Sequence, residues 1–274
     1  MVGCFVLELK RAETTSGERP WRPRVGSRGG ELPPAFYGLV NAVDSELGDR
    51  LHAASGRAPY TAGCFKLRSG GDGLRLRFTA LTREVFAALS AGLFARLTGG
   101  ERLRLGGEPF ELVRFTFDGA DEPLAGLSDY PRLLPPTPPR HLSFRFLTPA
   151  TFRAGDANLP LPLPQSVFRG LWEKWNAFAP PDLRMDREVL TVAEKHVVPC
   201  AFRVRSAERQ VKQGKVVGFF GNCRYEILGD QSPEVAQALG ALTNYAFYAG
   251  VGAKTTMGLG QVLTECAPDR KSVV

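Results

Sequence analysis

The sequence predicts an α+β protein built from two tandem ferredoxin-like domains. The expected elements follow the order β-α-β-β-α-β twice along the 274 residues, and this is the order of a ferredoxin-like module. Between the two rounds, residues 130–139 hold five prolines, a composition typical of a stiff linker. We therefore expect an N-terminal domain at residues 1–130, a linker at residues 131–140 and a C-terminal domain at residues 141–274. No clear sequence repeat relates the halves, so the duplication rests on element order alone.

The N-terminal domain begins with alternating apolar and polar residues at 5–10, which indicate a strand. Residues 11–34 are rich in Arg, Gly, Pro and Ser and are expected to form a basic loop, which either orders on RNA or is simply solvated. Residues 34–47 carry apolar side chains at helical spacing, so one helix is expected there. The remaining elements are expected in the order strand, strand, helix and one or two further strands, at residues 60–68, 74–81, 82–97 and 103–117.

The C-terminal domain is expected to repeat this order. Its elements are placed as strand, helix, strand, strand, helix and strand at residues 142–147, 166–178, 198–205, 215–228, 232–248 and 261–264. The first of these helices carries Trp172 and Trp175 on an apolar stripe, so both side chains are expected in the core rather than against RNA bases. The second helix begins with a Ser-Pro-Glu sequence, which is typical of a capped helix start.

A glycine-rich loop separates the last helix from the last strand and reads Gly250-Val-Gly-Ala-Lys-Thr-Thr-Met-Gly-Leu-Gly260. Glycine permits positive φ, adjacent N–H groups in such a turn form a concave anion site, and a lysine adds positive charge. The loop is not a nucleotide P-loop, because Ala253 precedes the lysine and a helix precedes the loop. A tight turn that packs backbone against backbone is the alternative. The pattern favours a phosphate-backbone cradle made of Gly250, Gly252, Lys254, Thr255, Thr256, Gly258 and Gly260.

The composition predicts a basic surface and argues against several other classes of protein. The formal net charge is +7 and the pI is near 9.3, which fits a nucleic-acid partner. Candidate RNA contacts are Arg22, Arg24, Arg28 and Arg57. The five cysteines form no CxxC pair and the three histidines show no ligand spacing, so we expect no metal site, no cofactor and no disulfide framework. No apolar run approaches the roughly 20 residues of a membrane helix, and the scattered cysteines favour the reducing cytoplasm as the compartment.

The glycine loop, together with the Val-Gly-Phe-Phe-Gly segment at 217–221 and the helix end at 245–250, resembles the signature of the Cas6 family. These are CRISPR-associated repeat-RNA endoribonucleases of the RAMP superfamily, and the resemblance covers most of the last third of the chain. It implies two ferredoxin-like domains and an enzyme that cleaves CRISPR precursor transcripts within repeats to release guide RNAs. The implied partners are CRISPR repeat RNA and other subunits of a CRISPR effector complex, and the implied state is a monomer or homodimer.

Because the sequence shows no metal-ligand set, RNA cleavage is expected to use the nucleophile that RNA carries. The 2′-OH attacks the adjacent phosphorus and expels the 5′-oxygen, and by resemblance the products are a 2′,3′-cyclic phosphate and a 5′-OH. A histidine suits the proton transfers, and a lysine or arginine suits the added charge, for which Arg57 is a candidate.

The resemblance singles out His52, because Leu51-His52 lies after the first helix and before a Pro-Tyr-Thr strand start, and it places Tyr37 and Lys66 at helper positions. From its chemistry alone, His52 equally suits capping of a helix C-terminus. His141 and His196 are more simply explained by packing and by a surface ion pair. The rival function is a non-catalytic RNA-binding RAMP subunit of an effector complex, which needs the glycine loop but no histidine.

Overall fold

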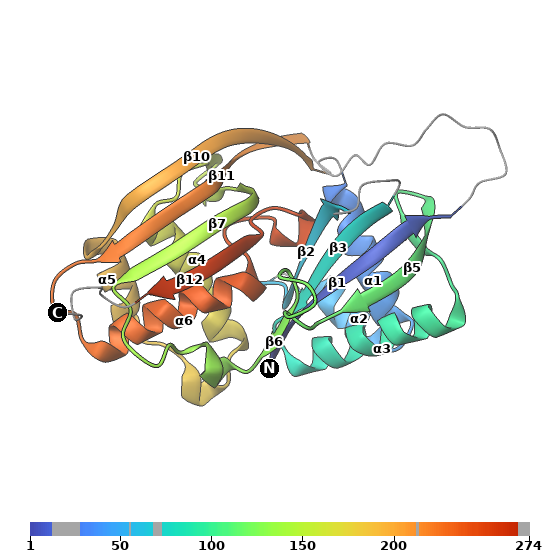
Figure 1. The fold of residues 1–274 in the computed structure, drawn as a ribbon, viewed down its shortest axis with the longest axis horizontal. Coiled ribbons are helices and arrows are strands. Elements are labelled where there is room, and N and C mark those ends of the chain that lie inside the picture. Colours follow the sequence, from blue (N-terminus) through green and yellow to red (C-terminus); the bar gives the residue numbers. More distant parts are fainter. Residues whose placement is uncertain (13–27, 55, 68–72, 212–213, 268–274) are drawn as a thin grey trace. The chain divides into compact units, whose positions relative to one another are not determined.

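The computed structural model describes residues 1–12, 28–54, 56–67, 73–211 and 214–267. The chain divides into two compact units (Figure 1). The first comprises Met1–Leu127 with the short segments Gln210–Lys215 and Thr256–Gly258, and the second comprises Ser128–Arg209, Val216–Thr255 and the chain from Leu259 onward. Among the residues described, no helix is both long and apolar enough to cross a membrane.

The first unit is an antiparallel sheet with helices packed against it (Figure 1). Its strands follow the order β2-β3-β1-β5-β4, and β6 also pairs with β1. The strands are β1 (Val2–Arg11), β2 (Tyr60–Lys66), β3 (Gly73–Ala80), β4 (Leu103–Leu105), β5 (Glu108–Thr116) and β6 (Gly126–Ser128). The helices are η2 (Gly29–Glu31), α1 (Leu32–Asn41), α2 (Ser45–Ala53) and α3 (Arg83–Gly99). Fully buried Phe5, Phe36 and Phe78 lie in the core between sheet and helices.

The single helix expected at residues 34–47 is in fact two helices, α1 and α2. The side chain of Asp44 accepts a 2.8 Å hydrogen bond from the Leu47 N–H and so caps α2. An Asp side chain that satisfies a free backbone N–H favours a new helix start over continuation of the preceding helix. His52, which was expected to lie after the helix at residues 34–47, therefore lies in the last turn of a second helix, α2.

The second unit contains a four-stranded sheet in the order β10-β11-β7-β12, in which β7 pairs antiparallel with both β11 and β12. Its strands are β7 (His141–Ala150), β10 (Val197–Val211), β11 (Gly214–Ile227) and β12 (Val262–Ala267), with a separate pair β8 (Phe152–Ala154) and β9 (Ala157–Leu159). Its helices are η3 (Tyr130–Leu133), α4 (Pro164–Phe178), η4 (Pro181–Leu183), α5 (Glu188–Lys195) and α6 (Pro233–Ala249). The short helix η5 (Thr255–Met257) begins in this unit and continues into the segment Thr256–Gly258, which belongs to the first unit. Both units thus confirm the predicted ferredoxin-like fold class. Helix α5 and the pair β8–β9 were not expected from the sequence.

One face of the second sheet is covered and the other is open. Helix α6 packs on β7 and β12, and α4 packs on α6 (Figure 1). Trp175 of α4 is fully buried, as the sequence predicts, and its indole N–H donates to the Leu183 carbonyl at 2.7 Å. Along β7, Phe144 and Phe146 are buried while Arg145 between them is exposed, so alternate side chains face the helices and the open side.

The proline-rich segment packs onto the second unit. Asn244 of α6 donates a 2.9 Å hydrogen bond to the Leu133 carbonyl, and Gln237 donates to the Pro135 carbonyl at 3.3 Å. A Cβ added at Gly240 would lie 2.6 Å from the Pro135 ring and 2.9 Å from the Pro139 ring. The segment therefore lies directly against α6, at a place where only a glycine fits.

Candidate active site and RNA-binding elements

The structure brings two of the three candidate catalytic residues together in the first unit. The rings of Tyr37 on α1 and His52 on α2 meet edge to face, with centroids 5.4 Å apart and an interplanar angle of 84°. The Tyr37 hydroxyl donates to the Leu51 carbonyl at 3.3 Å, which ties the two helices together beside the imidazole. His52 is exposed and lies in the last turn of α2.

A pocket surrounds this pair. Within the first 127 residues it is lined by Gly30, Pro33, Pro34, Tyr37, Asn41, Gly48, Asp49, His52 and Tyr60. The Tyr60 ring stacks on Phe36 at 3.7 Å between centroids, and burial, followed by its hydrogen bond with Tyr37, raises the pKa of Tyr60 far above its ordinary value. Tyr60 therefore stays neutral at physiological pH. The arrangement presents an exposed imidazole, that of His52, beside the aromatic rings of Tyr37 and Tyr60.

Lys66 does not join this pair. It ends strand β2, whose other end is Tyr60, and the rise of an extended strand separates the two by roughly 20 Å. Tyr60 is the end of the strand that lies beside Tyr37, with ring centroids 5.9 Å apart. The sequence pattern predicts that Lys66 lies on a strand, but it does not show which end of that strand approaches the histidine.

The candidate arginines fall in three different settings. Arg57 is exposed in the segment that leads from α2 to β2. Arg28 is only 6% exposed, and its guanidinium donates to Glu31 at 2.7 Å and to Glu108 at 3.0 Å. Two carboxylates and burial give this side chain a structural role in the first unit. Arg22 and Arg24 lie outside the described residues.

Two glycines of the loop are required by close backbone packing. Gly252 and Gly260 adopt φ values of +85° and +63°, and an added Cβ would overlap the Thr151 and Val251 carbonyl oxygens respectively. The Val251 N–H donates to the Gly260 carbonyl at 2.9 Å, and this bond closes the loop. The side chains of Val251 and Leu259 are buried and anchor it. The alternative interpretation, a tight turn, is therefore supported for these two glycines.

The middle of the loop contains the cation and the hydroxyls. Lys254 is half-buried and has a positive φ of 57°, which is unusual for a residue other than glycine. Thr256 is also half-buried, whereas Thr255 is buried and its hydroxyl accepts a 3.0 Å hydrogen bond from Lys174 of α4. Lys174 also donates to the Ala249 carbonyl at 2.6 Å, so it stabilises the end of α6 and the loop together. Nothing in the sequence around Lys174 indicated this role.

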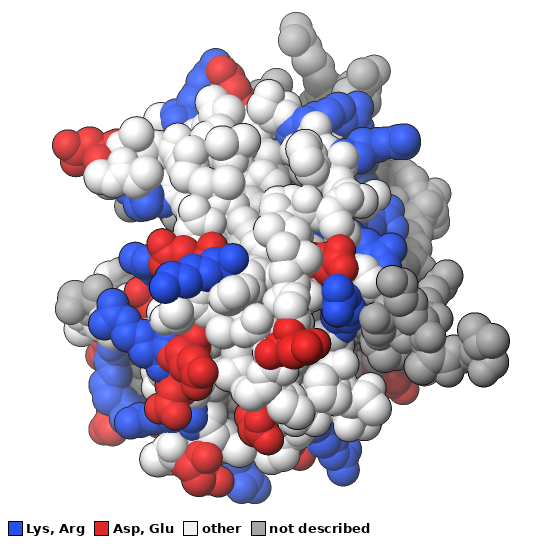
Figure 2. Space-filling view, turned by 90° about the vertical axis from the view of Figure 1, so that its left-hand side faces the viewer, with Lys and Arg blue, Asp and Glu red and all other residues white. Residues whose placement is uncertain are grey.

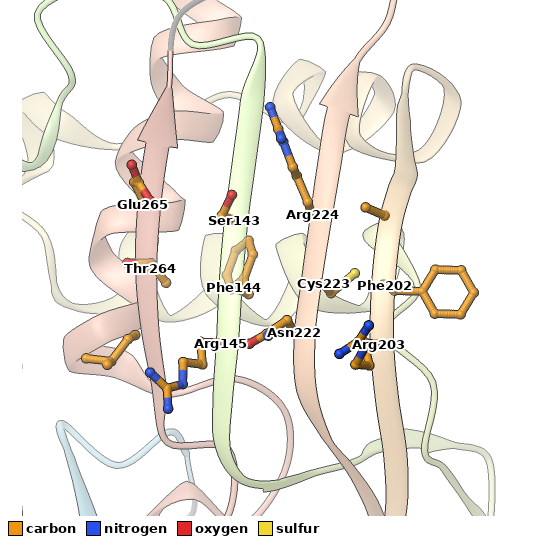
Figure 3. A pocket seen from close by; sticks show the side chains of 12 residues that line it. Ser143, Phe144, Arg145, Phe202, Arg203, Asn222, Cys223, Arg224, Thr264 and Glu265 are labelled. Carbon is orange, nitrogen blue, oxygen red and sulfur yellow. The ribbon is translucent and has the colours of Figure 1, made fainter.

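The open face of the second sheet forms a shallow cavity of about 530 Å³ (Figure 3). Arginines from three strands line it, namely Arg145 of β7, Arg203 of β10 and Arg224 of β11, together with Asn222 and Phe202. Phe202 is 67% exposed, a large apolar surface for a single side chain. Guanidinium groups bind phosphates and exposed aromatic rings stack on bases, so this face has the composition of a single-stranded RNA surface.

The net charge alone does not locate an RNA surface. Figure 2 shows the side of the molecule at the left of Figure 1, where blue Lys and Arg and red Asp and Glu are interspersed with broad uncharged areas. Individual arginines on defined strands therefore locate a candidate RNA surface better than the formal net charge of +7 does.

One group of metal-ligating residue types comes together in the second unit. His141, Cys200 and Glu226 place one ligand atom each within 4.8 Å of one another. No metal site was expected from the sequence, because these residues show no motif spacing. Sheet register brings them together, and register is not visible in a spacing search.

This chain is similar to known Cas6 proteins in sequence and in structure. A family model described as CRISPR-associated endoribonuclease Cas6 matches residues 144–262. Cas6 of Mycobacterium tuberculosis is 26% identical over 253 residues, which is 92% of this chain and 77% of that protein. A Cas6 product complex is 31% identical with a TM-score of 0.82, covering 97% of this chain and 99% of the other. Thermus thermophilus Cas6 is 30% identical with a TM-score of 0.73, covering 97% and 98%. The chain therefore belongs to the Cas6 family of CRISPR-associated endoribonucleases.

Proposed function

We propose that this protein cleaves CRISPR precursor transcripts within their repeats and releases guide RNAs, by a metal-independent reaction in which His52 transfers a proton. The observation that carries the proposal is the exposed His52 imidazole held against Tyr37 in a pocket. Family membership supports the substrate, because similar Cas6 structures include a product complex and a substrate-mimic complex.

The reaction needs two proton transfers and a stabilised phosphorane. A base removes the proton of the 2′-OH, the 2′-oxygen bonds to phosphorus, and the bond from phosphorus to the 5′-oxygen breaks as that oxygen receives a proton. The products are a 2′,3′-cyclic phosphate and a 5′-OH. His52 is proposed as the general acid or base, because an imidazole changes charge near neutral pH and here is open to solvent. Arg57, on the segment after α2, is proposed to stabilise the added negative charge.

Two elements of the second unit are proposed to hold RNA. Lys254 supplies a positive charge on a loop whose backbone is held rigidly by Val251 and Gly260. The open face adds Arg145, Arg203 and Arg224 for phosphates and Phe202 for stacking. We further propose a cytoplasmic monomer or homodimer that passes its product to other CRISPR effector subunits, and size-exclusion chromatography with light scattering checks the oligomeric part.

A cleavage assay tests the proposal. Labelled repeat RNA is incubated in EDTA with wild type, His52→Ala and His196→Ala; His196 is an exposed histidine of the second unit and serves as the matched control. We expect wild type and His196→Ala to cleave, and His52→Ala to bind RNA without cleaving it. Product ends are identified by mass spectrometry, which distinguishes a 2′,3′-cyclic phosphate from a hydrolysed end.

Other outcomes assign the function differently. Tight binding without cleavage by wild type supports the non-catalytic RNA-binding subunit. Equal cleavage by wild type and His52→Ala moves the chemistry to another residue. Cleavage that requires an added divalent metal ion contradicts the metal-independent step.

A further inference from the structure

Three neighbouring strands of the second unit converge on a small group of ligand-type side chains. His141 begins β7 and is the cross-strand partner of Glu226 on β11. Cys200 lies on β10, and its thiol donates to the Arg224 carbonyl of β11 at 3.4 Å. One ligand atom from each of the three residues lies within 4.8 Å of the other two. Cys200 is exposed, and His141 and Glu226 are half-buried, so the group opens to solvent at the end of the sheet.

The imidazole of His141 provides a second, independent observation. Its Nδ1 atom is buried and has no hydrogen-bond partner among the described residues. Buried polar atoms are nearly always paired, and an exception calls for an explanation. A metal ion bound by the ring, with the other nitrogen held by an outer partner, is a common environment for histidine in proteins.

The donor types select the kind of ion. Thiolate, imidazole and carboxylate together suit Zn²⁺, whereas Mg²⁺ and Ca²⁺ prefer oxygen ligands only. Zinc bonds of this kind place tetrahedral ligand atoms about 3.5 Å apart, so the three ligand atoms, now within 4.8 Å of one another, must move closer together on binding, and a fourth ligand such as water completes the tetrahedron. The Nε of Arg140 lies 3.2 Å from one Glu226 oxygen, which orients the carboxylate and leaves its second oxygen for the ion.

We propose that His141, Cys200 and Glu226 form a zinc-binding site that fastens strand β10 to β11 and β7. Strand β10 is the outer strand of the sheet, and most of its side chains are exposed. It contributes Phe202 and Arg203 to the open face. The ion therefore fixes the position of an edge strand that carries proposed RNA contacts, and it takes no part in cleavage.

Cobalt spectroscopy on the full-length protein tests the site. After removal of metal with EDTA, Co²⁺ is titrated into wild type and Cys200→Ser. We expect wild type to bind one equivalent and to show the near-ultraviolet charge-transfer absorption of a cobalt thiolate, and Cys200→Ser to lack that absorption. Cys200 is exposed, so this variant is expected to fold normally. Cys266→Ser is the matched control, because Cys266 is a half-buried cysteine of the same sheet outside the group.

Zinc affinity, measured by competition with a chromophoric chelator, gives a second readout. His141→Ala and Glu226→Gln are expected to weaken Zn²⁺ binding by more than the roughly 10- to 100-fold that loss of an outer partner costs, and His196→Ala to leave it unchanged. Zn²⁺ should also protect Cys200 from alkylation in wild type. The proposal is wrong if wild type binds no Zn²⁺, or if Cys200→Ser retains the thiolate absorption or wild-type affinity. RNA cleavage in EDTA is measured separately, so the zinc site and the catalytic proposal fail or stand independently.

Discussion

Replacement of Gly260 by alanine tests whether the glycine loop is held by backbone packing. Gly260 has a φ of +63°, and an added Cβ would overlap the carbonyl oxygen of Val251. The same glycine is bonded on both sides, since its carbonyl accepts from the Val251 N–H and its N–H donates to the Pro149 carbonyl, each at 2.9 Å. The methyl group therefore cannot be accommodated without movement of hydrogen-bonded backbone.

The expected loss of stability follows from two contributions. A residue other than glycine in the left-handed region costs about 1–2 kcal/mol. Displacement of the Val251 carbonyl strains or breaks a hydrogen bond of buried backbone, which costs about 1–3 kcal/mol. Together Gly260→Ala should lower the free energy of unfolding by roughly 2–5 kcal/mol, and the midpoint of thermal unfolding by roughly 4–20 °C for a domain of this size.

Thermal and urea unfolding followed by circular dichroism measure the effect. Gly170→Ala is the matched control, because Gly170 lies inside α4 and an added Cβ there meets nothing within 4 Å. This control should stabilise the protein by about 0.5–1 kcal/mol, since alanine is the better helix former. If Gly260→Ala unfolds at the wild-type temperature, the backbone-packing role of the loop glycines is refuted.

Three further predictions concern single side chains. Lys254→Gly should raise the free energy of unfolding by about 1 kcal/mol, as measured by denaturation, because φ is 57° at this position. The same variant should weaken the salt dependence of RNA binding by about one phosphate contact, as measured by gel shift at several salt concentrations. Tyr37→Phe keeps the ring beside the histidine and loses only the hydrogen bonds of the hydroxyl, to the Leu51 carbonyl and with Tyr60, at about 1 kcal/mol each, so single-turnover cleavage should fall far less than in Tyr37→Ala. Burial raises the pKa of Cys223 from 9.0 to about 11, so alkylation at pH 8 should label exposed Cys200 well before Cys223. For the same reason the free energy of unfolding should fall as the pH rises from 9 to 11. Equal labelling of both thiols in the folded protein contradicts the predicted difference in reactivity.

The parts of the fold that were predicted correctly depend on local patterns. Apolar alternation marks β1 and β7, and a Ser-Pro-Glu start marks α6, whose Ser232 hydroxyl accepts from the Val235 N–H at 3.2 Å. The break between α1 and α2 was missed because the apolar spacing runs on through Val43, which is 49% exposed in the structure. A periodic pattern shows which residues suit a buried face, and a cap such as Asp44 decides where the helix ends.

The candidate site was predictable only where its residues are neighbours along the chain. Tyr37 and His52 lie on consecutive helices and meet, whereas Lys66 is separated from them by the length of β2. Arg28 is basic in sequence, but its role depends on Glu108 of a distant strand, with which it forms a 3.0 Å ion pair. Composition therefore identified a basic protein, and only the fold shows which arginines are available to RNA.

The two interpretations of the glycine loop apply to different atoms of it. The N–H groups of Val251, Ala253 and Gly260 donate to backbone carbonyls, so they hold the loop and have no hydrogen left for a phosphate. Any phosphate must therefore meet the middle of the loop, around Lys254, which is also the residue that carries the positive charge. Rigid outer glycines then serve binding indirectly, because a lysine on a fixed backbone loses less conformational freedom when it contacts RNA. We therefore expect Gly260→Ala to change the stability of the fold and Lys254→Gly to change the affinity for RNA.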